Sequence, residues 1–120
     1  PWNRDRILVD PFCGSGTFPI EAAMLAATMA PGMNRSFLSE EWRNLIKRKC
    51  WYEAMDEASD LLETEVEVDI QGYDIDGDIV KAARANAESA GVDHMIHFQQ
   101  IHMVSPPLID SNSAVFPRFP

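Results

Sequence analysis

The sequence predicts an α/β fold built on a doubly wound, mostly parallel sheet. Three observations predict it. Short apolar runs alternate with segments of helical period, a glycine-rich turn follows the first apolar run, and the second apolar run ends in acidic residues. Strands that alternate with helices are typical of parallel sheets covered by helices. The chain has 120 residues, which corresponds to one domain.

The first strand is expected at residues 6–9, a short and apolar run. The first helix should begin near Thr17, which is a plausible N-cap, with Pro19 in its first turn. It should continue to about Met29, because Pro31 and Gly32 follow and would end it.

Two further helical segments are expected before the second strand. Residues 39–46 carry three apolar side chains at helical spacing: Trp42, Leu45 and Ile46. The next apolar stripe consists of Trp51, Met55, Ala58 and Leu62, and its opposite face is acidic, as on a solvated helix. We expect the three tryptophans of the chain to serve in packing.

The second strand is expected at residues 66–73, which alternate apolar and polar residues and end at Asp74. Asp76 or Asp78 can cap the helix that follows, and Gly91 is a suitable C-cap. A third strand is expected at residues 96–101. Residues 1–102 then form the ordered unit, and residues 103–120, which contain four prolines, form an irregular tail.

Composition limits the function classes. The net charge of −9 gives no electrostatic attraction to nucleic acid, so a basic surface for it should lie elsewhere. Two cysteines without a C-x-x-C pair indicate a reducing, cytoplasmic compartment. No apolar run approaches the roughly 20 residues of a membrane span. The first residues do not form a signal peptide and suggest a piece of a larger protein.

The glycine-rich turn at residues 10–17 is compatible with few ligands. A phosphate-binding loop needs a lysine after its last glycine, and none follows Gly16. A dinucleotide fingerprint needs a third glycine, which is missing. A hydrolase elbow needs glycines two positions either side of its serine, but Cys13 and Thr17 stand there.

S-Adenosylmethionine fits better, because it carries a cationic sulfonium and an ammonium group and no phosphate. Asp10 suits the cationic groups, and small residues let the backbone approach the methionine portion closely. Asp74, at the end of the second strand, is placed to bond ribose hydroxyls. Ile75 can pack on the adenine face.

Several segments then resemble one family: Asp10–Thr17, Ile20–Ala23, Ala30–Arg35, Trp42, Gly72–Asp76, Ala83–Ala87 and Ala90–Val92. They are similar to the THUMP-containing RNA methyltransferases, also labelled rRNA guanine-N2 methyltransferases or N6-adenine-specific DNA methylases. The resemblance covers about residues 2–101. It implies the N-terminal half of a Rossmann-like class I methyltransferase fold and methyl transfer to an exocyclic base nitrogen, usually in 23S rRNA.

The resemblance also implies a cofactor site. The methionine side would be formed by Asp10, Pro11, Cys13, Gly14, Ser15, Gly16 and Thr17. Asp74 would hold the ribose, with Asp76 a weaker candidate, and Ile75 would contact the adenine. His102 stands where the family usually has an acid that contacts the adenine amine.

The chain departs from the family in one major respect. The N-P-P-Y motif that holds the flipped target base is absent, and Ser105–Leu108 is only a superficial echo at the wrong spacing. The THUMP domain is absent as well. We therefore expect this chain to bind S-adenosylmethionine without catalysing transfer, and RNA to be bound by parts of the parent protein not present here. Open strand edges predict self-association.

Other interpretations stay open at this stage. The chain could be a non-catalytic cofactor-binding or protein-interaction module. A DNA adenine methylase is less favoured, and a nicotinamide dehydrogenase domain is less favoured again. Cys13 lacks a neighbouring base and is interpreted as a small turn residue rather than a nucleophile. No metal site is expected, since His94, His97 and His102 lack a cluster of further ligands.

Overall fold

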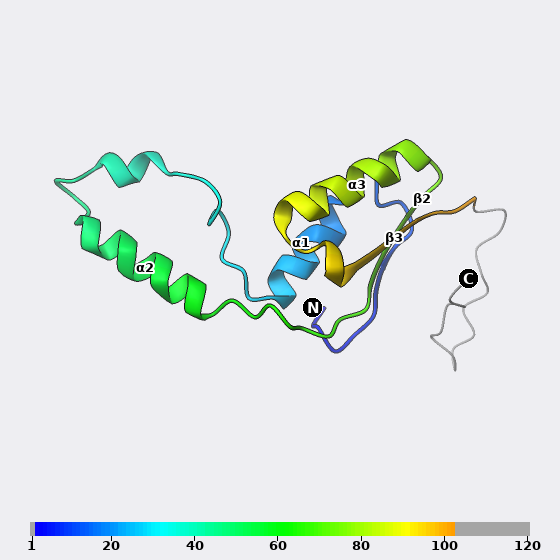
Figure 1. The fold of residues 1–120 in the computed structure, drawn as a ribbon, viewed down its shortest axis with the longest axis horizontal. Helices are drawn as coiled ribbons and strands as arrows, with labels where there is room; N and C mark the ends of the chain where they lie inside the picture. The colour runs from blue at the N-terminus through cyan, green and yellow to red at the C-terminus, as the bar shows by residue number, and fades with distance from the viewer. Residues whose placement is uncertain (1, 103–120) are drawn as a thin grey trace.

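A computed structural model describes residues 2–102 of the chain, so the tail expected at residues 103–120 lies outside the described residues. Strands alternate with helices along the chain (Figure 1). The elements are, in order, β1 (Leu8–Asp10), α1 (Thr17–Ala26), the 3₁₀ turn η1 (Leu38–Glu41), α2 (Arg48–Asp60), β2 (Ile70–Asp74), α3 (Gly77–Ala90), the 3₁₀ turn η2 (Asp93–Met95) and β3 (Ile96–Gln100).

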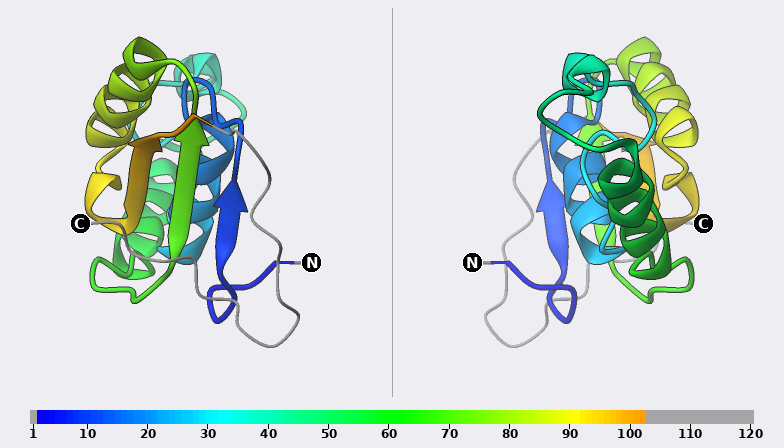
Figure 2. Two further views of the ribbon diagram at one scale, coloured as in Figure 1. Left: turned by 90° about the vertical axis from the view of Figure 1, so that its right-hand side faces the viewer. Right: turned by 90° about the vertical axis from the view of Figure 1, so that its left-hand side faces the viewer.

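The three strands form one parallel sheet in the order β1-β2-β3, with Leu8, Ile70 and Ile96 in register. α1 and α3 pack together on one face of the sheet, as Figures 1 and 2 show. The predicted parallel α/β architecture is confirmed. A doubly wound sheet also has helices on its other face, and residues 2–102 supply none there.

Small residues bring the helices close to the sheet. Ala23 in α1 and Ala83 and Ala87 in α3 have no exposed surface. They face Ile70 and Phe98, whose side chains are 2% and 4% exposed. Alanine occupies five of the eight buried positions of α1 and α3, beside the larger Pro19, Ile20 and Val80, and it lets the helices approach the sheet closely.

The predicted limits of β1, α1 and β2 need correction. β1 spans Leu8–Asp10 and not residues 6–9. Thr17 is not the N-cap of α1, since Gly16 takes that position with a φ of 84° and no side-chain cap bond is present. The helix ends at Ala26, short of Met29, and Thr28 has a positive φ of 54°. β2 begins at Ile70 and not at Val66, because its partner β1 has only three residues and begins opposite Ile70.

The prediction of a helix at residues 39–46 is wrong, because only the 3₁₀ turn η1 forms, at the start of this segment. Its apolar face has little to pack against, for Trp42 is 51% exposed and Leu45 is 80% exposed. The next predicted helix is present as α2, but none of its residues is buried. Trp51 stacks on Phe37 with 5.9 Å between ring centroids.

Residues 31–62, which contain η1 and α2, form an arm that extends away from the sheet (Figure 1). The radius of gyration is 18.0 Å, whereas a compact domain of about 100 residues has one of about 13 Å. The arm is fastened at its base, where the Glu63 amide donates to the Ala27 carbonyl and the Glu63 carboxylate accepts from Arg4 at 2.7 Å. The arm is therefore anchored at its base, where Leu62 also packs against the core, and none of the buried core residues comes from it.

Candidate cofactor site

The predicted site residues gather at the carboxyl edge of the sheet. The turn of residues 10–16 follows β1, residues 74–76 follow β2, and His102 follows the end of β3 by two residues. Parallel strands place their carboxyl ends along one edge, which is where α/β folds bind ligands. The order of the strands puts the first two of these segments side by side.

The glycine-rich turn has the backbone that its sequence predicts. Gly14 and Gly16 both lie in the left-handed region, with φ values of 53° and 84°. Gly16 is also enclosed, because a Cβ there would lie 2.9 Å from the Phe98 ring and 3.0 Å from the Cβ of Ala83. At Gly14 a Cβ would meet nothing within 4 Å. The turn therefore packs against Phe98 and Ala83 at Gly16, and it is open to a ligand at Gly14.

Asp74 joins the end of β2 to this turn. Its Oδ2 accepts a hydrogen bond from the Gly14 amide at 3.0 Å, and its Oδ1 accepts one from the Asp76 amide at 3.0 Å. The Cys13 amide adds a 2.7 Å bond to the Tyr73 carbonyl. Bonds from the Asp76 and Gly14 amides hold the pKa of Asp74 below its ordinary value, so the carboxylate is charged at neutral pH.

The turn lies in a negative electrostatic environment. Burial, then the charges of Asp10 and Asp74, raise the pKa of the Cys13 thiol to about 11. Cys13 is therefore a neutral thiol at pH 7, which agrees with its interpretation as a turn residue and not a nucleophile. A site flanked by two carboxylates favours cationic ligand groups over phosphates.

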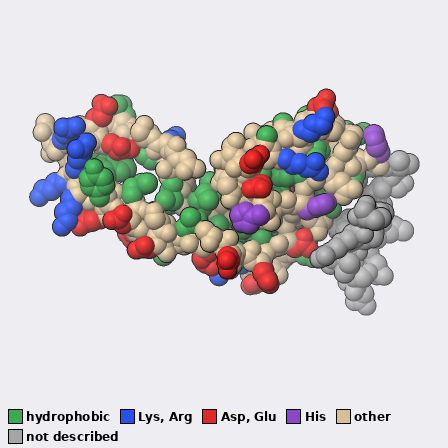
Figure 3. Space-filling view, in the orientation of Figure 1, with side chains coloured by type: hydrophobic (Ala, Val, Ile, Leu, Met, Phe, Trp, Pro, Cys, Tyr) green, Lys and Arg blue, Asp and Glu red, His purple; other side chains and the backbone are tan. Residues whose placement is uncertain are grey.

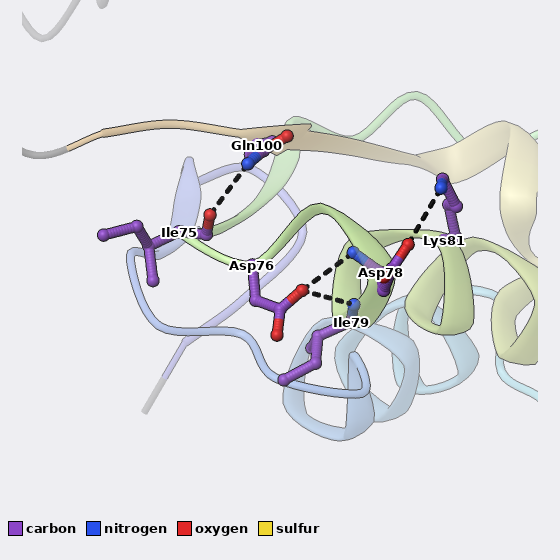
Figure 4. A network of polar contacts seen from close by, with 6 residues as sticks. All are labelled: Ile75, Asp76, Asp78, Ile79, Lys81 and Gln100. Carbon is purple, nitrogen blue, oxygen red and sulfur yellow. Dashed lines mark hydrogen bonds and ion pairs between the residues drawn. The ribbon is translucent and has the colours of Figure 1, made fainter.

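Asp76 and Ile75 differ in what they leave available to a ligand (Figure 4). One carboxylate oxygen of Asp76 accepts from the amides of Asp78 and Ile79 at the start of α3, so the predicted cap is confirmed. Ile75 is 65% exposed, while its carbonyl accepts from the Gln100 side chain at 2.9 Å. Since the Gln100 side chain and the bond from the Asp76 amide to Asp74 hold the backbone on either side of it, the exposed Ile75 side chain offers a fixed apolar surface.

The remaining predicted residues lie at the rim of the site. Pro11, Ser15 and Thr17 are exposed, and the hydroxyls of Ser15 and Thr17 lie 3.4 Å apart. Asp10 accepts from the Phe12 amide at 3.1 Å, which closes the first bend of the turn. His102 is exposed and follows Ile101, whose amide donates to the Asp74 carbonyl at 2.9 Å.

Three supporting residues were not singled out from the sequence. Asn86 on α3 donates from its side-chain amide to the Ser15 carbonyl at 2.9 Å. Phe98 packs beneath the turn, and Gln100 holds the backbone of Ile75. Asn86 stands within the segment Ala83–Ala87 that carries the family resemblance, which was the one available signal for it.

A parallel sheet whose carboxyl edge carries a glycine turn and an acid after the next strand defines a Rossmann-like cofactor-binding domain. Residues 1–115 match the family model described as "RMKL-like, methyltransferase domain". The chain belongs to this family. The predicted resemblance to this methyltransferase family is confirmed.

Curated relatives carry names that agree with this family. The chain is 42% identical over 102 residues to "Putative RNA methyltransferase YpsC" of Bacillus subtilis, a match to 85% of this chain and 26% of that protein. It is 44% identical over 102 residues to "Ribosomal RNA large subunit methyltransferase K/L" of Shewanella pealeana, covering 81% of this chain and 14% of that protein. The chain thus spans about a quarter or less of these relatives.

Solved structures share the fold. "SMU.472, a putative methyltransferase complexed with SAH" superposes with a TM-score of 0.80 and 39% identity, over 85% of this chain and 27% of that one. The "predicted N6-adenine-specific DNA methylase" of Listeria monocytogenes gives a TM-score of 0.78 and 42% identity, over 85% and 26%. Within residues 2–102, no helix has the length and apolar character needed to cross a membrane.

Proposed function

We propose that this chain is the S-adenosylmethionine-binding portion of an RNA base N-methyltransferase that acts on 23S rRNA. The observation that carries the proposal is the bond from the Gly14 amide to Asp74, which fixes the glycine turn beside the acid at the end of β2. The relative named as an rRNA large-subunit methyltransferase and the structure named as an SAH complex support the substrate class and the cofactor.

Each side of the cofactor has a candidate partner in this chain. Asp10 and Asp74 supply the negative charge that suits a sulfonium and an ammonium group. Each carboxylate oxygen of Asp74 keeps acceptor capacity beyond its one backbone bond, so ribose hydroxyls can donate to it. The exposed face of Ile75 suits the adenine ring, and His102 can accept from the adenine amine.

The bound cofactor supplies an activated methyl group, and the chain positions it. Direct displacement by a base amine needs orientation and exclusion of water rather than a protein nucleophile, which is consistent with a neutral Cys13. The base-holding N-P-P-Y motif is absent from the sequence. RNA is accordingly held in large part by other regions of a cytoplasmic parent protein, and residues 1–102 act as its cofactor half.

Calorimetric titration with S-adenosylhomocysteine tests the cofactor assignment. Asp74→Asn should weaken binding by about 10- to 100-fold, because it replaces a charged acceptor of two hydroxyl bonds. Asp78→Asn is the matched control, since Asp78 is exposed, lies four residues away and pairs with Lys81 at 2.9 Å. Folding without any binding by the unmodified chain would remove the cofactor claim, and equal affinities of both variants would remove the ribose role of Asp74.

Transfer of labelled methyl groups distinguishes the remaining alternatives. The proposal expects binding of the cofactor without transfer to 23S rRNA by this chain alone, and transfer by the parent protein. Transfer by the parent to DNA adenine, and not to rRNA, would favour the DNA methylase alternative. A parent protein that binds the cofactor and transfers to neither would favour the non-catalytic module.

Self-association belongs to the same proposal. β1 and β3 are the edges of the sheet formed by residues 2–102. The Arg84 guanidinium donates to the Phe98 carbonyl and so covers part of the β3 edge. Among residues 2–102 no such side-chain bond reaches the β1 edge, which is therefore the favoured contact between copies, since open strand edges pair with other strands. Light scattering should show dimers whose fraction falls after Val9→Pro, and a strictly monomeric chain would contradict this part.

A further inference from the structure

The far end of the arm concentrates positive charge in an acidic chain. The net charge of the whole chain is −9, yet residues 43–49 contain four cations and no acid: Arg43, Lys47, Arg48 and Lys49. Figure 3 shows Lys and Arg gathered at the end of the arm. Asp and Glu lie on the arm close to them and over the rest of the visible surface, where a second, smaller group of Lys and Arg is also seen. We name residues 43–49 the basic tip.

The cations of the basic tip are available to a partner. All four residues are exposed. Within residues 2–102, Lys49 alone among them has a carboxylate within 4 Å, the Glu53 oxygen at 3.3 Å, and both side chains of that pair are largely exposed. Such an exposed pair is weak and easily exchanged for another anion.

Helix stability does not explain this charge distribution. Arg48 and Lys49 begin α2, where the helix dipole is positive and acids would be favourable, and the first turn of α2 contains no acid. The last turn, where cations would be favourable, contains none. The order of charges along α2 is thus the reverse of the one that stabilises a helix. It adds to the positive potential at the end of the arm.

The side chains beside the basic tip suit nucleic acid better than an acidic protein. Trp42 is 51% exposed directly before Arg43, and the aliphatic Leu45 lies between the cations with 80% exposure. A positive surface with an exposed aromatic ring can contact phosphates and stack on an unpaired base. Because the arm extends away from the sheet, it reaches a part of a large substrate remote from the cofactor (Figure 1).

We propose that the basic tip binds phosphates of the RNA substrate, at a position remote from the base that is methylated. This inference rests on the proposed function for the identity of the anion as RNA. It locates an RNA contact in this chain, whereas the composition predicted that RNA binding lies wholly elsewhere. The acidic remainder of the surface repels phosphates, so RNA should meet this chain at the tip.

The test measures binding of a fluorescently labelled RNA stem–loop to the full chain over a range of KCl concentrations. Arg43→Gln with Arg48→Gln should lower the slope of log affinity against log salt by about two and weaken binding about tenfold or more. Arg6→Gln with Lys81→Gln is the control, because it removes the same charge from exposed positions outside the arm. The control should change the slope by less than half as much.

Three results would overturn the inference: no RNA binding by the unmodified chain at low salt, equal losses in the tip and control variants, or equally tight tip-dependent binding of polyglutamate. The last would indicate an acidic protein partner instead. Titration of the same proteins with S-adenosylhomocysteine keeps the two proposals separate. If the unmodified chain binds the cofactor but not RNA, the inference alone is rejected. If it binds RNA through the tip but does not bind the cofactor, the proposed cofactor function alone is rejected.

Discussion

The two glycines of the cofactor turn should respond differently to the same substitution. Alanine at either position must adopt a left-handed backbone, which costs about 1–2 kcal/mol. At Gly16 the new methyl group would also lie 2.9 Å from the Phe98 ring and 3.0 Å from the Cβ of Ala83. Overpacking of a close-packed site adds about 1–3 kcal/mol. Gly14→Ala meets no atom within 4 Å and lacks this second cost.

The expected free energies of unfolding follow directly. Gly16→Ala should lose about 2–5 kcal/mol and Gly14→Ala about 1–2 kcal/mol, relative to the unmodified chain. Urea denaturation followed by tryptophan fluorescence measures both, provided that the slopes with denaturant agree. The measurement is made without cofactor, so that loss of ligand contacts at Gly14 does not enter.

A second substitution tests the cause of the difference. Phe98→Leu in the Gly16→Ala background removes the ring atoms that the new methyl group would meet. The double variant should be more stable than the sum of the two single losses predicts, which is a coupling between neighbouring sites. Equal losses at Gly14 and Gly16, or strict additivity with Phe98→Leu, would refute the view that contact with the Phe98 ring fixes the turn.

Four further predictions concern groups around the turn. Asn86→Ala should weaken S-adenosylhomocysteine binding several-fold, because the turn loses the 2.9 Å hydrogen bond from Asn86 to the Ser15 carbonyl. Asn86→Asp should bind as weakly, since the aspartate side chain lacks the donor. Unchanged affinity would reject the role of Asn86 in holding the turn. Cys13 should be alkylated by iodoacetamide at pH 8 at least about tenfold more slowly than an unperturbed thiol. The raised pKa leaves about 100-fold less thiolate, which outweighs the higher nucleophilicity of the Cys13 thiolate. The exposed Cys50 serves as the reference, and equal alkylation rates of the two cysteines would contradict the pKa of about 11. The same raised pKa means that unfolding releases a proton above pH 9.0, so the free energy of unfolding should fall as pH rises from 9.0 toward about 11, and Cys13→Ser should flatten that decline. Asp76→Ala should destabilise the chain by about 1 kcal/mol through loss of the α3 cap, with a smaller effect on cofactor affinity than Asp74→Asn.

Sequence reasoning succeeded where local chemistry determines structure. The glycine turn between β1 and α1, the Asp76 cap and the Gly91 C-cap are set by backbone conformations that few residues adopt. The acid at the end of β2 was found because an apolar strand must end where polar residues resume. These signals lie within a few residues of the features they determine, so a single sequence reveals them.

Sequence reasoning failed where tertiary contacts decide. β2 was expected to begin at Val66, and nothing local shows that β1 has only three residues and pairs from Ile70 onward. The helix expected at residues 39–46 had a correct period, but in the structure its Trp42 and Leu45 remain exposed. Periodicity predicts a helix only when some surface buries the periodic face.

The same limit explains why the supporting contacts of the site escaped notice. The bond from Asn86 to Ser15 spans 71 residues, and the bond from Gly14 to Asp74 spans 60. Asp74 was predicted because it follows an apolar strand, whereas Asn86 lies on an exposed helix face where no sequence pattern distinguishes it. In the fold, α3 follows β2 and returns across the sheet to lie against α1, which brings Asn86 to the turn. The cofactor turn is therefore held by β2 and α3, two elements that lie 60 or more residues further along the sequence. The geometry of the turn depends on the whole β1-α1-β2-α3 unit and not on the glycines alone.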